Sequence, residues 1–177
     1  MRIVTSRRQV LGWGCALALG AARGASAASR AERVLGFRNL HTGESLRAVY
    51  WAEGRAVAEG CARIAQVLRD HRTGEAHPID LRLLDLLWTL SSGLEARAPF
   101  QVISGYRSPR SNAALAAASD GVARNSLHMQ GLAIDVRLED APLERLHRAA
   151  VTLRGGGVGL YRRSDFVHLD VGRVRTW

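Results

Sequence analysis

Apolar and polar residues alternate in several short stretches of the chain, which is the spacing of β-strands. The first two stretches, residues 34–40 and 45–51, flank a glycine-containing loop and predict a β-hairpin. Residues 100–104 form another short β-favouring run. Alternation returns at residues 132–136 and 166–172. These stretches are expected to enter a sheet.

Other segments carry apolar residues at the three- and four-residue spacing of helices. This spacing predicts helices over residues 57–68, 81–94 and 142–153. Asp80 is expected to cap the second of them. An alanine-rich stretch at 111–118 predicts one more helix. Together the elements indicate an α+β fold, with a small antiparallel sheet flanked by helices.

The N-terminal 27 residues differ in composition from the rest of the chain and have the pattern of an export signal. The pair Arg7-Arg8 precedes an uncharged, largely apolar run at 12–22, and Ala25-Ser26-Ala27 has the small residues of a cleavage site. Paired arginines in this position are typical of twin-arginine leaders. The apolar run is too short for a permanent membrane span.

The remaining length accommodates one domain. We therefore divide the chain into a twin-arginine-like signal peptide (residues 1–27), a linker (28–33) and one domain (34–177). Removal of the leader would take Cys15 with it, and Cys61 alone cannot form an intrachain disulfide.

The charge of the chain is positive but scattered. The 177 residues carry a formal charge of +9, and all 25 basic residues are arginine. Without the leader's four arginines the balance is 21 minus 16, or +5. Aromatic residues make up only 6%, so the combination of basic patch and stacking side chains seen in nucleic-acid binders is weak. We expect no nucleic-acid partner.

Asp135 is the first residue that indicates a functional site. It alternates with apolar residues in the run 132–136, and a carboxylate buried there needs a charged partner or a metal. His128 precedes it, and His168 lies on the polar face of the later strand. Two histidines and one carboxylate suit a single catalytic zinc ion with an open fourth position.

The other histidines carry weaker signals. His41 belongs to the hairpin turn, His71 and His77 to a polar loop, and His147 to the helix at 142–153. Structural or surface roles are the simpler interpretation of all four. Arg107, by contrast, ends the β-favouring run and begins a loop, where functional side chains tend to collect.

Several short motifs occur in a characteristic order. They are Ser104-Gly105-Tyr106-Arg107-Ser108, Ser126, His128-x-x-Gly131-x-Ala133-x-Asp135, the Gly-Val-Gly-Leu-Tyr run at 157–161 and Phe166-Val167-His168. This set resembles the D-alanyl-D-alanine metallopeptidases, the LAS-type zinc peptidases that include lysostaphin-type enzymes and the hedgehog signalling domain. Within that group the chain is most similar to the bacterial murein endopeptidase branch, from residue 34 to the C-terminus.

The resemblance assigns roles to individual residues. It implies that His128, Asp135 and His168 bind one zinc ion, and that Arg107 and Ser126 help to hold the substrate or polarise its carbonyl group. Arginine's fixed fork of donors suits such a role.

The catalytic base is where the chain departs from the family pattern. Carboxypeptidases of the group place a glutamate three residues before the last histidine ligand, and this chain has Asp165 there. Asp165 is therefore a candidate base, although Ser164-Asp165 is also a favourable turn pair. Asp170, on the same strand face as His168, is the second candidate, either as base or as the group that orients a ligand.

These observations and the resemblance together imply an exported or periplasmic zinc metallopeptidase. The expected reaction is hydrolysis of peptide bonds in peptidoglycan, as a murein endopeptidase or carboxypeptidase, by metal-activated water. The alternative is a zinc-containing cell-wall binding or scaffold domain with little or no activity. The expected partner is the peptidoglycan peptide itself.

Overall fold

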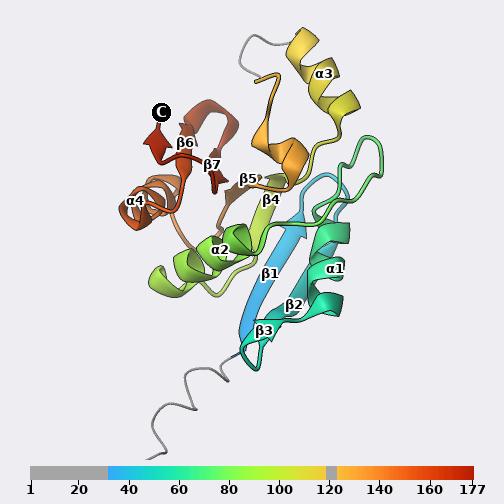
Figure 1. The fold of residues 1–177 in the computed structure, drawn as a ribbon. Helices are drawn as coiled ribbons and strands as arrows, with labels where there is room; N and C mark the ends of the chain where they lie inside the picture. Colours follow the sequence, from blue (N-terminus) through green and yellow to red (C-terminus); the bar gives the residue numbers. More distant parts are fainter. Residues whose placement is uncertain (1–31, 119–122) are drawn as a thin grey trace, which may run out of the picture.

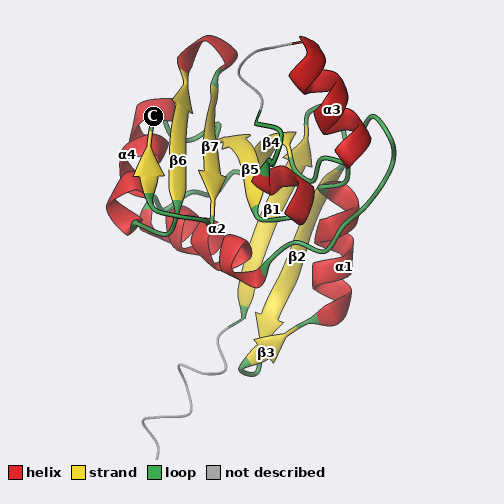
Figure 2. Ribbon diagram, turned by 45° about the horizontal axis from the view of Figure 1, so that its top comes forward, coloured by secondary structure: helices red, strands yellow, loops and turns green. Residues whose placement is uncertain are grey.

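The computed structural model describes residues 32–118 and 123–177. The expected signal peptide and most of the linker lie outside these residues. The described part forms a single 8-stranded sheet with helices packed on it (Figures 1 and 2). The strands are β1 (Arg33–Asn39), β2 (Ser45–Ala52), β3 (Arg55–Ala56), β4 (Phe100–Ser104), β5 (Ala133–Arg137), β6 (Gly157–Tyr161), β7 (Phe166–Asp170) and β8 (Arg175–Thr176).

The sheet is larger than expected and mixed rather than antiparallel. Its order is β3-β2-β1-β4-β5-β7-β6-β8, and most neighbours, including the predicted β1–β2 hairpin, are antiparallel. However, β1 and β4 are parallel, as are β6 and β8. Parallel neighbours require a crossover connection, and the chain between β3 and β4 supplies it with two helices. The expectation of a small antiparallel sheet is thus met only in part, because the sheet has eight strands and two parallel pairs, while the α+β class is confirmed.

The described residues contain four α-helices: α1 (Ala58–Val67), α2 (Leu81–Gly93), α3 (Pro109–Ala118) and α4 (Leu143–Leu153). All four were expected, although α3 begins two residues earlier than predicted. Asp80 caps α2 as predicted, because its side chain accepts a hydrogen bond from the backbone N–H of Arg82. Within the described ranges, no helix has the length and hydropathy needed to cross a bilayer.

The apolar core lies between the sheet and helices α1, α2 and α4, whereas α3 stands away from the sheet (Figure 1). Its fully buried members include Phe37, Tyr50, Ile64, Leu83, Leu84, Leu87, Phe100, Leu146 and Val167. On β5, Ile134 and Val136 are completely buried. Because side chains alternate along a strand, Asp135 faces the opposite side of the sheet, away from this core.

Candidate metal centre

The strand register places two of the three expected ligands side by side. Asp135 on β5 pairs directly with His168 on β7. The same row continues to Ser104 on β4 and to Gly159 on β6. Directly opposed residues project from the same face of a sheet, so the carboxylate and the imidazole meet.

The third ligand comes from the short 3-10 helix η2 (Leu127–Gln130). Ser126 caps this turn through its hydroxyl, which accepts from the N–H of His128. Gly131 ends it at φ +66°, and an added Cβ there would lie 2.2 Å from the carbonyl oxygen of Pro78. A glycine is therefore required at the point where the chain turns from η2 towards β5.

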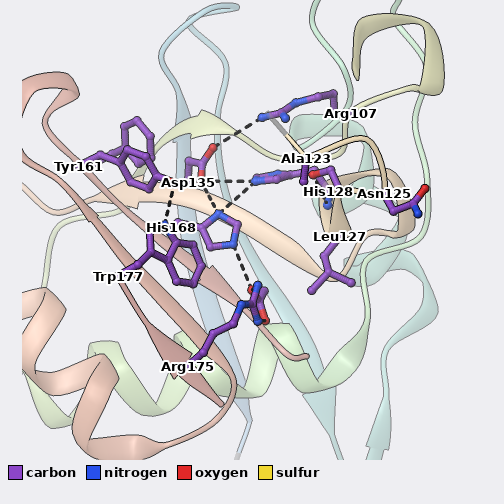
Figure 3. Close-up of a pocket in the computed structure, with 13 residues that line it drawn as sticks. Arg107, Ala123, Asn125, Leu127, His128, Asp135, Tyr161, His168, Arg175 and Trp177 are labelled. Carbon is purple, nitrogen blue, oxygen red and sulfur yellow. Dashed lines mark hydrogen bonds and ion pairs between the residues drawn. The ribbon is translucent and has the colours of Figure 1, made fainter. Parts of the chain in front are cut away.

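The three side chains converge at one point (Figure 3). His168 Nδ1 lies 2.8 Å from Asp135 Oδ1, and His128 Nε2 lies 3.3 Å from His168 Nδ1 and 3.4 Å from Asp135 Oδ1. His128 and Asp135 are buried, and His168 is nearly so. These are the three residues that the sequence analysis expected as ligands. Their geometry allows them to hold one metal ion.

The other nitrogen of each imidazole already has a protein partner. His128 Nδ1 lies 2.8 Å from the carbonyl oxygen of Gly105, and His168 Nε2 lies 3.2 Å from Asp170 Oδ2. Metal-binding histidines commonly donate their second N–H to a carbonyl or carboxylate, which fixes the tautomer. This leaves His128 Nε2 and His168 Nδ1, the two atoms that face Asp135, to bind a cation. The residues present therefore fit a metal.

The electrostatics of the cluster also favour a cation. Burial alone would raise the pKa of Asp135, but the two imidazoles beside it hold the pKa below its ordinary range. Burial would lower the pKa of His168, but hydrogen bonds to Asp135 and Asp170 outweigh burial and raise it to about 9. Because the pKa of His168 is raised, a metal ion that bound there would compete with a proton.

Asp170 is held by donors on all sides. Its side chain is fully buried and accepts from the backbone N–H groups of Gly157 and Gly172 at 3.0 and 2.8 Å. Arg175 approaches the other oxygen at 2.7 Å. Although burial opposes it, hydrogen bonds from His168, Arg175 and the backbone keep the pKa of Asp170 below its ordinary range. Such a carboxylate is well placed to orient His168.

Asp165 lies elsewhere. It ends the short turn Arg162–Ser164 at φ +53°, and its side chain is 60% exposed. Its carboxylate forms an ion pair with Arg137. Asp165 borders a separate surface hollow with Gln101 and Arg137 rather than the cavity of the metal cluster. In this structure Asp165 therefore lies at the turn, away from the cluster.

Arg107 and Ser126 both line the cavity that contains the cluster. The Arg107 guanidinium lies 3.8 Å from Asp135 Oδ2 and donates to Ser104 Oγ at 3.3 Å. Its Nε is buried without a protein partner among the described residues. Arg107 thus lines the cavity with its guanidinium beside Asp135, whereas the hydroxyl of Ser126 is engaged in capping η2.

The remaining histidines of the described part stay outside the cluster. His41 contacts the carbonyl oxygen of Ile103 at 3.0 Å and stacks on His71, with ring centroids 3.8 Å apart. His77 stacks on Tyr106, and His147 lies on α4. None of the four lines the cavity.

The cavity has a volume of about 390 Å³ and contains residues that the sequence did not single out for the site. Among them are Tyr161, Arg175 and Trp177, which lie on the His168 side of the cluster, opposite Arg107 (Figure 3). Strand β8 spans only Arg175–Thr176, too short to show any periodicity. The only sign in the sequence that this segment contributes to the cavity is that Arg175 and Trp177 follow His168 closely.

The fold and the geometry of these side chains define an α+β domain with a His-Asp-His cluster that could hold a metal ion and that opens to a cavity. A sequence model of the family described as peptidoglycan L,D-endopeptidase MepK matches residues 27–177. The chain belongs to this family. The resemblance to the LAS-type peptidases is thereby confirmed.

Two relatives illustrate the similarity. The peptidoglycan L,D-endopeptidase MepK of Escherichia coli (strain K12) is 41% identical over 177 residues, covering 97% of each chain. The probable peptidoglycan L,D-endopeptidase MepK of Haemophilus influenzae is 42% identical over 147 residues, covering 82% of this chain and 78% of the relative. No solved structure matches the chain significantly.

Proposed function

We propose that this protein is a zinc metallopeptidase that cleaves peptide bonds within peptidoglycan. The observation that carries the proposal is the convergence of His128 Nε2, Asp135 Oδ1 and His168 Nδ1 beside an open cavity. The extensive identity to relatives named as peptidoglycan L,D-endopeptidases supports the substrate class and an endopeptidase reaction at an L,D-bond.

Zinc is the proposed metal because of the donor set. Two imidazole nitrogens and one carboxylate oxygen, with a further position open to the cavity, are characteristic of catalytic zinc sites. A bound zinc ion supplies a Lewis acid that lowers the pKa of water and polarises a substrate carbonyl group. His128, Asp135 and His168 would hold it.

Arg107 is the proposed partner of the substrate carbonyl group. Its guanidinium lies 3.8 Å from Asp135 Oδ2, and Arg107 lines the cavity. Donors that are already oriented towards developing negative charge stabilise it without further reorganisation. Ser126 contributes indirectly, because its cap holds η2, and with it His128, in place. Asp170 and Arg175 fix the ring of His168 from behind.

Asp165 is the proposed general base by its position three residues before His168. This role requires the turn at 162–165 to move the carboxylate from Arg137 towards the cavity. Asp165→Asn should then lower kcat by orders of magnitude while bound zinc stays near one ion per chain. Glu59→Gln, which changes an exposed carboxylate on α1, is the matched control. Unchanged kcat in Asp165→Asn would remove Asp165 from the mechanism.

The leader is proposed to carry the protein out of the cytoplasm by the twin-arginine route. The family match begins at residue 27, the expected end of the leader, which supports this division of the chain. Replacing Arg7 and Arg8 by lysine should leave full-length protein in the cytoplasm, as immunoblots of cell fractions would show. Normal export of the double variant would contradict the twin-arginine assignment.

Digestion of purified cross-linked muropeptides tests the function as a whole. The zinc-loaded protein should release smaller fragments, whereas chelator-treated protein and Asp135→Ala should release none. Mass spectrometry of the fragments identifies the bond that is cut. Stoichiometric zinc without any cleavage would instead favour the wall-binding scaffold. The position of Asp165 outside the cavity is compatible with this alternative.

A further inference from the structure

Trp177 occupies space that a glycine leaves free beside the metal centre. Gly159 lies opposite His168 in the row of paired residues that crosses the sheet. A Cβ at Gly159 would approach the indole ring of Trp177 to 2.6 Å. The ring therefore lies over the glycine, and its centroid is 5.3 Å from that of His168. Trp177 is thus a direct neighbour of a metal ligand.

Several contacts fix this indole in place. The backbone of Trp177 pairs with β6, donating to the carbonyl oxygen of Val158 at 3.2 Å and accepting from the N–H of Leu160 at 3.0 Å. The indole Nε1 donates to Tyr161 Oη at 2.9 Å. The guanidinium of Arg175 lies over the ring, 4.8 Å from its centroid. The side chain is therefore held before any ligand arrives.

Despite these contacts, Trp177 remains 49% exposed and lines the cavity. A tryptophan that only supported His168 would not need to leave half of its surface open. A rigid, half-exposed aromatic side chain offers a large contact area at little cost in conformational entropy. This combination is typical of a side chain that binds a ligand.

The two sides of the cavity differ in chemistry. Arg107, on one side of the cluster, lines the cavity with its guanidinium beside Asp135. Trp177 and Tyr161 lie on the other side (Figure 3), where the guanidinium of Arg175 also lines the cavity and is already paired with Asp170. The Trp177 side is thus suited to apolar and planar groups and the Arg107 side to carbonyl or carboxylate oxygens.

We propose that Trp177, supported by Tyr161, is a specificity-determining residue that packs against the substrate residue next to the scissile bond. The group it receives is the aliphatic part of that residue's side chain together with the adjoining peptide plane. This inference rests on the proposed peptidase function and adds a subsite to it.

Steady-state kinetics on a purified cross-linked muropeptide test the inference. Trp177→Ala should raise KM about tenfold and leave kcat within about twofold, because the lost contact is made in the ground state and the transition state alike. Trp177→Phe should recover most of the affinity. Trp88→Phe, a change on α2 away from the cavity, is the matched control and should behave as wild type.

Each other result has a defined meaning. An unchanged KM in Trp177→Ala, while the wild-type protein cleaves the substrate, would overturn the inference alone. A loss of bound zinc or of kcat without a change in KM would show that Trp177 only supports His168, and would also overturn it. Absence of cleavage by the wild-type protein would instead remove the proposed function.

A binding experiment decides the inference even if Trp177→Ala does not fold. In two-dimensional NMR spectra the indole N–H signal of Trp177 is assigned by its loss in Trp177→Phe. Addition of muropeptide to the zinc-loaded Asp165→Asn protein should shift this signal and leave those of Trp51 and Trp88 in place. No shift of the Trp177 signal at saturating muropeptide would overturn the proposal.

Discussion

At the scale of single residues, buried carboxylates shape the surroundings of the His-Asp-His cluster. Asp70 is only 2% exposed and lies beneath the loop that carries Arg107. It accepts from the backbone N–H of Ser108 at 2.9 Å, from the Ser108 hydroxyl at 2.7 Å and from the N–H of Arg72 at 2.9 Å. Asp70 thus ties the loop at 70–75 to the loop that begins α3.

Loss of the Asp70 charge should destabilise the protein in a pH-dependent way. Burial would raise the pKa of Asp70, but hydrogen bonds from Ser111, Ser108 and Arg72 lower it below its ordinary value of 3.8. A depressed folded-state pKa stabilises the protein above that value, and the stabilisation is lost as the pH falls below it. Asp70→Asn should therefore lower the free energy of unfolding by about 2 kcal/mol at pH 7.

Urea unfolding at several pH values measures this difference. The gap between wild type and Asp70→Asn should narrow once the pH falls below about 4. A gap of constant size from pH 7 to pH 3 would mean that the charge of Asp70 contributes nothing.

Asp170 allows a second prediction, on metal affinity. If it orients His168, Asp170→Asn should weaken zinc binding about 10- to 100-fold, measured by competition with a chromophoric chelator. Asp165→Asn, whose side chain is outside the cavity, should bind zinc as wild type does. Equal affinities in wild type and Asp170→Asn would contradict the orienting role.

Much of the candidate site was predictable from single residues, because two of the three residues in the cluster broke a local rule. Asp135 stood in an apolar strand, and His168 lay on the polar face of another. The position of Asp165 and the contribution of Trp177 were not predictable. The first depends on an ion pair with Arg137, and the second on the missing side chain of Gly159, and neither relation leaves a local pattern.

At the scale of elements, the end of β4 supports the ligand-bearing η2. Gly105 follows β4, and its carbonyl oxygen accepts from His128 Nδ1. A Cβ on Gly105 would lie 2.4 Å from the carbonyl oxygen of Leu68, which is also the acceptor for the N–H of Tyr106. The close approach of two backbones therefore sets the position of His128.

Gly105→Ala should weaken both the fold and the site. The clash with Leu68 involves backbone atoms, so relief requires the end of β4 to move. We expect a loss of about 2 kcal/mol or more in the free energy of unfolding, together with weaker zinc binding. Gly93→Ala, at a glycine with no heavy atom within 4 Å of an added Cβ, is the control and should not reduce stability.

Most elements were predictable because each has its own periodicity, as in the hairpin β1–β2 and helices α1, α2 and α4. The direction of β4 was not, because its parallel pairing with β1 is set by contacts far apart in the chain. Strands β3 and β8 have two residues each and show no periodicity.

At the scale of the whole molecule, the arrangement of the cluster would couple metal binding to folding. The cluster draws its ligands from η2, β5 and β7, and an unfolded chain does not bring them together. A cation that binds only the folded state stabilises it by mass action.

Zinc should therefore raise the melting temperature. At a free concentration about 100 times its dissociation constant, zinc should add about 2.7 kcal/mol, or about 5–10 °C for a chain of this size. Scanning calorimetry with and without chelator measures the shift, and His168→Ala should show none. An equal shift in His168→Ala would place the stabilising ion somewhere else.

The direct pairing of Asp135 with His168 has a practical consequence for protein recovered from inclusion bodies. If β5 and β7 paired one residue out of register, one of the two side chains would turn to the opposite face of the sheet. Such a misfolded chain would still contain strands and helices and would give an ordinary circular dichroism spectrum, but it would bind no metal. Zinc stoichiometry therefore distinguishes correctly paired molecules from slipped ones in a refolded preparation.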